Sequence, residues 1–116
     1  MDDLVKAVLA FRDQRDWKQF HNPKDLAISI TLEAAELLEH FQWKTAAQVA
    51  TFLGSDENRR RVGQEMADVL ILLISLADAV GLDLLEAARA KLQENEGKYP
   101  VDRSRGNATK YDKLSP

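Results

Sequence analysis

Hydrophobic residues recur at helical spacing along almost the whole chain. From Leu4 onward they form a stripe that ends near Trp17, which predicts a first helix. Similar amphipathic patterns predict further helices over residues 23–42, 45–53, 56–80 and 83–96. Because no segment shows the strict alternation of apolar and polar residues typical of a strand, the sequence predicts an all-α fold.

Capping residues mark several of these helix boundaries. Asn22 precedes a proline that fits the first turn of a helix, and Ser55 is a suitable N-cap for the long helix that follows it. Gly81 predicts the end of that helix. Asp83, with Glu86 three residues later, predicts a capping box at the start of the fifth helix.

Composition and charge limit the class of protein. The chain has 116 residues, of which 45% are hydrophobic and 30% charged, as expected for one globular domain over residues 1–116. The polar tail from about residue 100 is expected to be partly ordered. The absence of cysteine excludes disulfides, thiolate metal sites and a cysteine nucleophile.

The same features bear on partners and location. A formal net charge of −3 argues against general nucleic-acid binding, which depends on many Lys and Arg contacts to phosphate. The amino terminus lacks the pattern of a signal peptide, and the longest apolar run, residues 69–74, is too short to span a membrane. We therefore expect no membrane partner and a cytoplasmic location.

Two pairs of carboxylates are the candidate chemistry. Glu33 and Glu36 lie three residues apart, and so share one face of the second helix. This pair alone is more typical of a solvated acidic stripe. Glu65 and Asp68 repeat the spacing at the start of the most apolar helix, where burial of unpaired charge is unfavourable. Together the pairs indicate a divalent cation, Mg²⁺ or alternatively Mn²⁺.

The two pairs form a pattern, Glu33-x-x-Glu36 followed by Glu65-x-x-Asp68, that resembles the MazG-like all-α nucleoside triphosphate pyrophosphohydrolases. FRDQRDWKQFHNPKDLAISITLEAAELLEHFQWK, residues 11–44, resembles the corresponding segment of the dCTP pyrophosphatase branch. KLQENEGKYPVDRSRG, residues 91–106, resembles the carboxy-terminal basic motif of that branch. The resemblance covers most of the chain.

This resemblance implies a four-helix-bundle-like, MazG-type fold with a short extra helix, a polar carboxy-terminal tail and assembly into a homo-oligomer, either a dimer or a tetramer. It implies Mg²⁺-dependent hydrolysis of nucleoside triphosphates, dCTP or related deoxynucleotides, to monophosphate and pyrophosphate. The four carboxylates would then be the metal ligands and the catalytic residues.

The resemblance also suggests residues that bind the nucleotide. Trp17 and Trp43 would stack on the base, although large aromatic residues at helix ends more often cover the core. His21 would donate to the base or a phosphate, or else make a local hydrogen bond. His40 lies two turns from Glu33 and is interpreted as structural.

Near the end of the fifth helix, four residues are candidate phosphate ligands. Their spacing of about one turn puts most of them in a row on the helix. On spacing alone, the lysines are better explained as complements to the helix dipole; the resemblance favours phosphate binding. The residues are Lys91, Asn95, Lys98 and Tyr99.

Two other classes of function stay open at this point. One is a non-catalytic helical interaction module whose carboxylates are solvated. The other is a di-metal carboxylate redox bundle, but such bundles use Glu-x-x-His pairs, and no His follows Glu33, Glu36 or Glu65 at that spacing.

Overall fold

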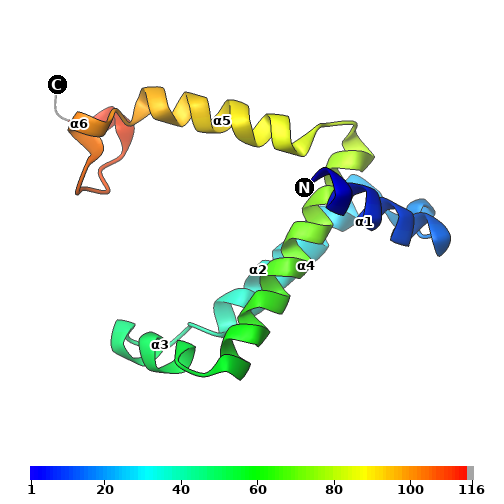
Figure 1. Cartoon of the computed structure of the whole chain (residues 1–116), viewed down its shortest axis with the longest axis horizontal. Coiled ribbons are helices and arrows are strands. Elements are labelled where there is room, and N and C mark those ends of the chain that lie inside the picture. Colours follow the sequence, from blue (N-terminus) through cyan, green and yellow to red (C-terminus); the bar gives the residue numbers. More distant parts are fainter. Residues whose placement is uncertain (115–116) are drawn as a thin grey trace. The chain divides into compact units, whose positions relative to one another are not determined.

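The chain folds into helices joined by short connections (Figure 1). The structure is a computed structural model that describes residues 1–114. Within that range there is no strand, and the all-α prediction is confirmed. The α-helices are α1 (Asp2–Gln14), α2 (Pro23–Glu39), α3 (Ala46–Leu53), α4 (Asp56–Val80), α5 (Leu84–Lys98) and α6 (Val101–Ser104), and the 3-10 helices are η1 (Lys18–Phe20) and η2 (Tyr111–Lys113).

The helices belong to two compact units. In the first, Met1–Leu82, the long helix α4 is central, because α1, α2 and α3 all pack against it. Its most extensive contact is with α2, and the two helices lie side by side (Figure 1). The second unit begins at Asp83 and contains α5, α6 and η2. One domain for the whole chain stays a prediction.

Capping side chains begin the helices where the sequence indicates. Asn22 accepts a hydrogen bond from the backbone N–H of Asp25, and Ser55 caps α4 in the same way. Gly81 ends α4 with a φ of 74°, a left-handed conformation that glycine adopts without steric cost. Asp83 caps α5, but the side chain of Glu86 pairs with an arginine, Arg89, so only half of the expected capping box forms.

Two helices are shorter than their apolar patterns predict. The stripe predicted α1 to continue to about Trp17, whereas the helix ends at Gln14 and the backbone of Asp16 turns left-handed, with φ at 54°. Likewise α2 ends at Glu39 instead of continuing to residue 42. The last residues form tighter turns, because the backbone N–H of Phe41 donates to the carbonyl of Leu38, three residues earlier. Apolar periodicity continues through such turns.

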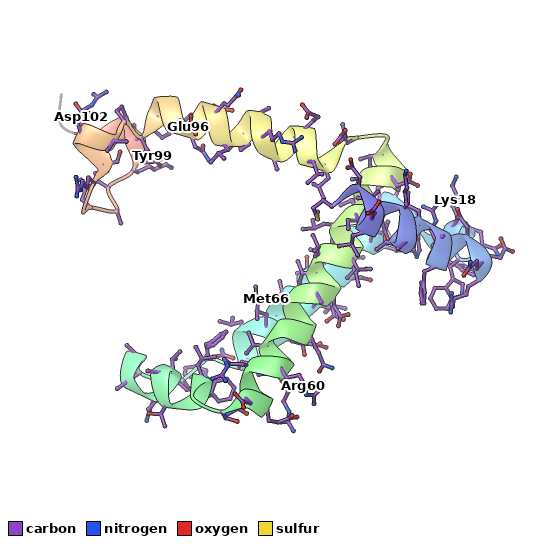
Figure 2. The ribbon with its side chains drawn as sticks, viewed as in Figure 1. Lys18, Arg60, Met66, Glu96, Tyr99 and Asp102 are labelled. Carbon is purple, nitrogen blue, oxygen red and sulfur yellow. The ribbon has the colours of Figure 1, made fainter. Side chains whose placement is uncertain are left out.

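The buried core of the described residues is small. Five hydrophobic side chains are buried, and they come from α1, α2 and α4: Val8, Leu26, Val62, Ile74 and Ala77. Arg12 is buried too, and its guanidinium donates to Asp78 over 2.6 Å, which ties α1 to α4. Many large apolar side chains stay exposed, including Met66 of α4 (Figure 2). Among residues 1–114, no helix has the combination of length and apolar character needed to cross a bilayer.

Candidate active site

Three of the four predicted carboxylates come together where α2 packs against α4. One oxygen from each of Glu33, Glu36 and Glu65 lies within 4.8 Å of the other two. Glu33 and Glu36 share a face of α2 because they are three residues apart, and the packing of the two helices brings Glu65 to that face. The sequence therefore predicted the residues of this cluster, and helix packing assembles them.

Glu33 is the most perturbed member of the carboxylate cluster. Its Oε2 atom is buried and has no hydrogen-bond partner in the described part of the chain. Burial, then the negative charge of Glu36 and the closeness of the Glu65 and Glu36 carboxyl groups, raises the pKa of Glu33 to about 7. The ionised carboxylate is thus disfavoured by its surroundings, and a nearby positive charge would reverse that effect.

Asp68 is placed differently from the other three carboxylates. It lies one turn after Glu65 on α4 and is exposed, and it is not part of the group whose oxygens lie within 4.8 Å. Its negative charge nevertheless contributes to the raised pKa of Glu33. Asp68 therefore lies at the margin of the cluster.

The residues present fit a hard divalent cation. All three clustered groups offer carboxylate oxygens, which are the ligands that Mg²⁺ and Mn²⁺ prefer. The buried oxygen of Glu33 has no other partner to compensate its lost hydration. A cation near this oxygen would offset both the desolvation and the mutual repulsion of the carboxylates.

The two tryptophans have unequal surroundings. Trp17 is partly exposed and meets Phe11 edge to face, with ring centroids 5.6 Å apart. Trp43 is 92% exposed, and its backbone is left-handed, with φ at 67°. Bulky residues seldom adopt this conformation, and strained backbone is found preferentially at functional sites. The interpretation that large aromatics cover the core does not describe Trp43.

His21 follows η1 and is half-buried. Its Nδ1 atom is buried and makes no hydrogen bond within the described residues. The expected alternative to ligand binding was a local hydrogen bond from this side chain. No such bond forms at Nδ1, so that nitrogen is left with an unmet hydrogen-bonding capacity.

In the second unit, two of the four predicted phosphate ligands pair with a carboxylate. Lys91 and Lys98 each pair with Glu94, at 3.4 Å and 2.8 Å. These contacts lower the pKa of Glu94 and raise that of Lys98. The lysines do form a row on α5, as predicted, but the sequence interpretation overlooked the glutamate between them. Glu94 lies one turn from each lysine in the sequence, and this spacing was sufficient to predict the two ion pairs.

The remaining predicted ligands lie in the same unit. Asn95 is half-buried, and its backbone carbonyl accepts a hydrogen bond from the N–H of Tyr99. Tyr99 is exposed at the end of α5, where its ring meets that of Tyr111 edge to face at 6.1 Å. Tyr111 also covers the ammonium of Lys98, which lies 4.7 Å from the ring centroid. The tail thus contacts residues predicted to bind phosphate.

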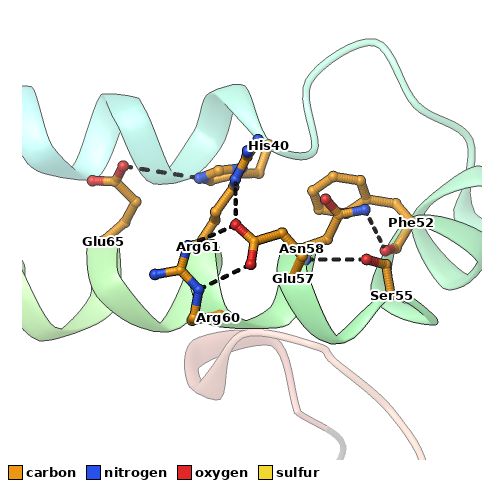
Figure 3. Close-up of polar contacts among 8 residues, drawn as sticks. All are labelled: His40, Phe52, Ser55, Glu57, Asn58, Arg60, Arg61 and Glu65. Carbon is orange, nitrogen blue, oxygen red and sulfur yellow. Dashed lines mark hydrogen bonds and ion pairs between the residues drawn. The ribbon is translucent and has the colours of Figure 1, made fainter.

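His40 is a neighbour of the carboxylate cluster that the sequence interpretation set aside. His40 lies two turns along α2 from Glu33, but the residue that its side chain approaches is Glu65 of α4 (Figure 3). Nε2 of His40 lies 3.9 Å from Oε1 of Glu65. Because His40 lies on the same helical face as Glu33, the sequence could have indicated that it is near the carboxylate cluster.

Known proteins resemble the chain over most of its length. Residues 28–114 match the MazG-like family. dCTP pyrophosphatase 1 of Rattus norvegicus is 38% identical over 114 residues, which is 98% of this chain and 67% of the relative. The Homo sapiens protein of the same name is 35% identical over the same shares of the two chains.

A solved structure supports the same relationship. A pyrophosphatase from Archaeoglobus fulgidus matches with a TM-score of 0.76 and 42% identity, over 86% of this chain and 92% of that one. The bundle-like, MazG-type fold expected from the sequence is thereby confirmed, as is the family resemblance. With both the sequence and the fold in agreement, the chain belongs to the MazG-like family.

Proposed function

We propose that this chain hydrolyses dCTP or a related deoxynucleoside triphosphate between the α and β phosphates, with Mg²⁺ held by carboxylates of α2 and α4. Its membership of the nucleoside triphosphate pyrophosphohydrolases rests on relatives that match nearly the whole chain. The observation that carries the metal proposal is the cluster of Glu33, Glu36 and Glu65 around a buried oxygen without a partner.

The proposed roles follow from the chemistry of each side chain. Glu33, Glu36, Glu65 and Asp68 would hold the cation, with Asp68 reaching it from the margin of the cluster. When bound, the cation would neutralise the charge of the triphosphate and favour attack at the α phosphorus. A water activated by a carboxylate of the cluster would attack, and the bond to the bridging oxygen would break, releasing monophosphate and pyrophosphate.

Other residues would bind the nucleotide. We propose that Trp43, and Trp17 with it, stacks on the base, since each has an exposed face. His21 would use its unpaired Nδ1 on the base or a phosphate. The α5 residues Lys91, Asn95, Lys98 and Tyr99 are proposed phosphate ligands, on the family resemblance and their chemistry.

The proposal extends to assembly and location. A homo-oligomer, dimer or tetramer, is favoured by the small core and by apolar side chains exposed on both α2 and α4. A cytoplasmic location is proposed from the sequence. The redox-bundle alternative is disfavoured, because within residues 1–114 the clustered metal-binding groups are carboxylates without histidine.

The test combines catalysis with stability. Pyrophosphate release should require Mg²⁺ and be fastest with dCTP among a panel of ribonucleoside and deoxyribonucleoside triphosphates. Glu36→Gln and Asp68→Asn should each reduce the rate of pyrophosphate release by about 100-fold or more. Loss of a metal ligand should cost at least as much activity as loss of a residue that only hydrogen-bonds to a ligand. Melting temperatures of both variants should match or slightly exceed the wild type, because a repelling charge has been removed.

Mg²⁺ or Mn²⁺ alone should stabilise the wild-type protein. At about 100 times the dissociation constant, mass action adds about 2.7 kcal/mol to the free energy of unfolding. Glu96→Gln, which removes an exposed carboxylate on α5, is the matched control and should behave as the wild type. If Glu36→Gln and Asp68→Asn retain near-full activity, the carboxylates are a solvated stripe and the proposed site is wrong.

A further inference from the structure

His40 occupies the position that ends α2, facing the first half of α4 (Figure 3). Its Nε2 atom lies 3.9 Å from Oε1 of Glu65, and the two side chains are 20% and 22% exposed. The separation is longer than a hydrogen bond. At this distance the imidazole still attracts a carboxylate, and one water or a small rotation of Glu65 would complete a hydrogen bond.

Aromatic packing holds the imidazole in place. The ring of His40 lies 6.0 Å from that of Phe52, tilted by 34°, and 6.3 Å from that of Phe41. Phe41 and Phe52 also contact each other edge to face. Phe52 belongs to α3, and its backbone carbonyl accepts a hydrogen bond from the side chain of Asn58 on α4. Three helical segments therefore restrict where the imidazole can point.

This contact is unusual among the carboxylates of the cluster. Within residues 1–114, no other ion-pair contact shorter than 4 Å involves Glu33, Glu36, Glu65 or Asp68. Arg60 and Arg61 are close to Glu65 in the sequence, but both pair with Glu57 instead (Figure 3). His40 is thus the one basic side chain within 4 Å of these carboxylates in the described chain.

We propose that His40 is a positioning residue that orients the carboxylate of Glu65 for cation binding. The inference rests on the proposed metal site and adds to it a residue outside the ligand set. A neutral imidazole carries one N–H, so the role requires no change of protonation. Partners of this kind fix the orientation of metal ligands, and their loss typically weakens metal binding by about 10- to 100-fold.

The test separates the nitrogen of His40 from its ring. His40→Phe keeps an aromatic ring against Phe41 and Phe52 but removes the donor, whereas His40→Gln keeps a donor and removes the ring. Mn²⁺ affinity of the full chain, measured by electron paramagnetic resonance, is the main readout, and the melting temperature without metal is the second. Glu65→Gln reports the loss of a ligand, and Glu96→Gln is the control for charge.

We expect His40→Phe to weaken Mn²⁺ binding by about 10-fold at an unchanged melting temperature. His40→Gln should bind Mn²⁺ more tightly than His40→Phe, even if it melts earlier. Wild-type affinity in His40→Phe would overturn the inference. So would equal losses of affinity in both variants accompanied by lower melting temperatures, because packing alone would then explain them.

The same titrations distinguish failure of the inference from failure of the proposed function. If the wild type binds Mn²⁺, Glu65→Gln does not and His40→Phe matches the wild type, the metal site stands and only the role of His40 is rejected. If Glu65→Gln binds Mn²⁺ as tightly as the wild type, the proposed metal site is rejected together with the role of His40.

Discussion

Trp43 shows how a single residue can combine strain with exposure. Its left-handed backbone costs a bulky side chain about 1–2 kcal/mol, and almost none of its ring is buried to offset that cost. A strained residue that contributes little to the stability of the fold is a good candidate for contact with a ligand. The strain and the proposed contact with the base can be tested separately.

We predict that Trp43→Ala raises KM for dCTP or weakens the preference among bases, while Trp43→Phe keeps most of the preference because a ring remains. Trp43→Gly should lose the preference as Trp43→Ala does. It should nevertheless be more stable than Trp43→Ala by about 0.5–1 kcal/mol, since glycine relieves the left-handed strain but gains entropy in the unfolded chain. Steady-state kinetics and denaturant unfolding provide the two measurements.

Nucleotide binding should also change tryptophan fluorescence in the wild type. The Trp43 variants should lose much of that change, whereas the Glu96→Gln control should retain it. An unaltered base preference in a well-folded Trp43→Ala protein would contradict contact between Trp43 and the base.

At the scale of one helix, α5 carries a glutamate that pairs with two of the proposed phosphate ligands. Glu94 contacts both Lys91 and Lys98, and the pKa of Lys98 is raised by this pairing. All three groups are partly or largely exposed, so the pairs are weak and easily exchanged for a phosphate. The glutamate would compete with a triphosphate for the same ammonium groups.

Replacing this competitor should therefore improve binding. We predict that Glu94→Gln lowers KM for the triphosphate a few-fold with little change in kcat, because both ammonium groups become available. Glu96→Gln removes the same charge from the same helix, and within residues 1–114 Glu96 forms no ion pair with a lysine, so this variant is the matched control. Equal KM values for the two variants would show that only overall charge matters.

At the scale of the whole molecule, the exposed apolar surface of the first unit is large for its core. Ile28 and Leu32 of α2 are exposed, as are Met66 and Ile71 of α4. Ile71 also lines an apolar pocket of about 250 Å³ beside residues of α1. Stable monomers rarely leave so many apolar side chains on adjoining helices uncovered.

We predict that the chain associates through this surface. Light scattering at micromolar concentration should give at least twice the mass of one chain. Ile71→Arg should reduce that mass, whereas Gln64→Arg, which adds the same charge at an exposed polar position of α4, should not. A stable monomer in the wild-type protein would contradict the prediction.

Local sequence determined most of the secondary structure. Asn22, Ser55 and Asp83 are N-caps as predicted, and Gly81 ends α4, because capping and left-handed turns depend on residues only a few positions apart. The same locality explains the errors at the ends of α1 and α2. The spacing of apolar residues does not show where an α-helix changes to a tighter turn or where the backbone becomes left-handed.

The candidate site was determined in part by the sequence and in part by tertiary structure. Spacing alone put Glu33 and Glu36 on one face of a helix. That Glu65 joins them while Asp68 stays outside the closest group, and that His40 approaches Glu65, was decided by how α2 and α4 pack. The rotation and axial shift of one helix against another depend on side-chain packing along their whole interface, which the periodicity of either helix does not encode.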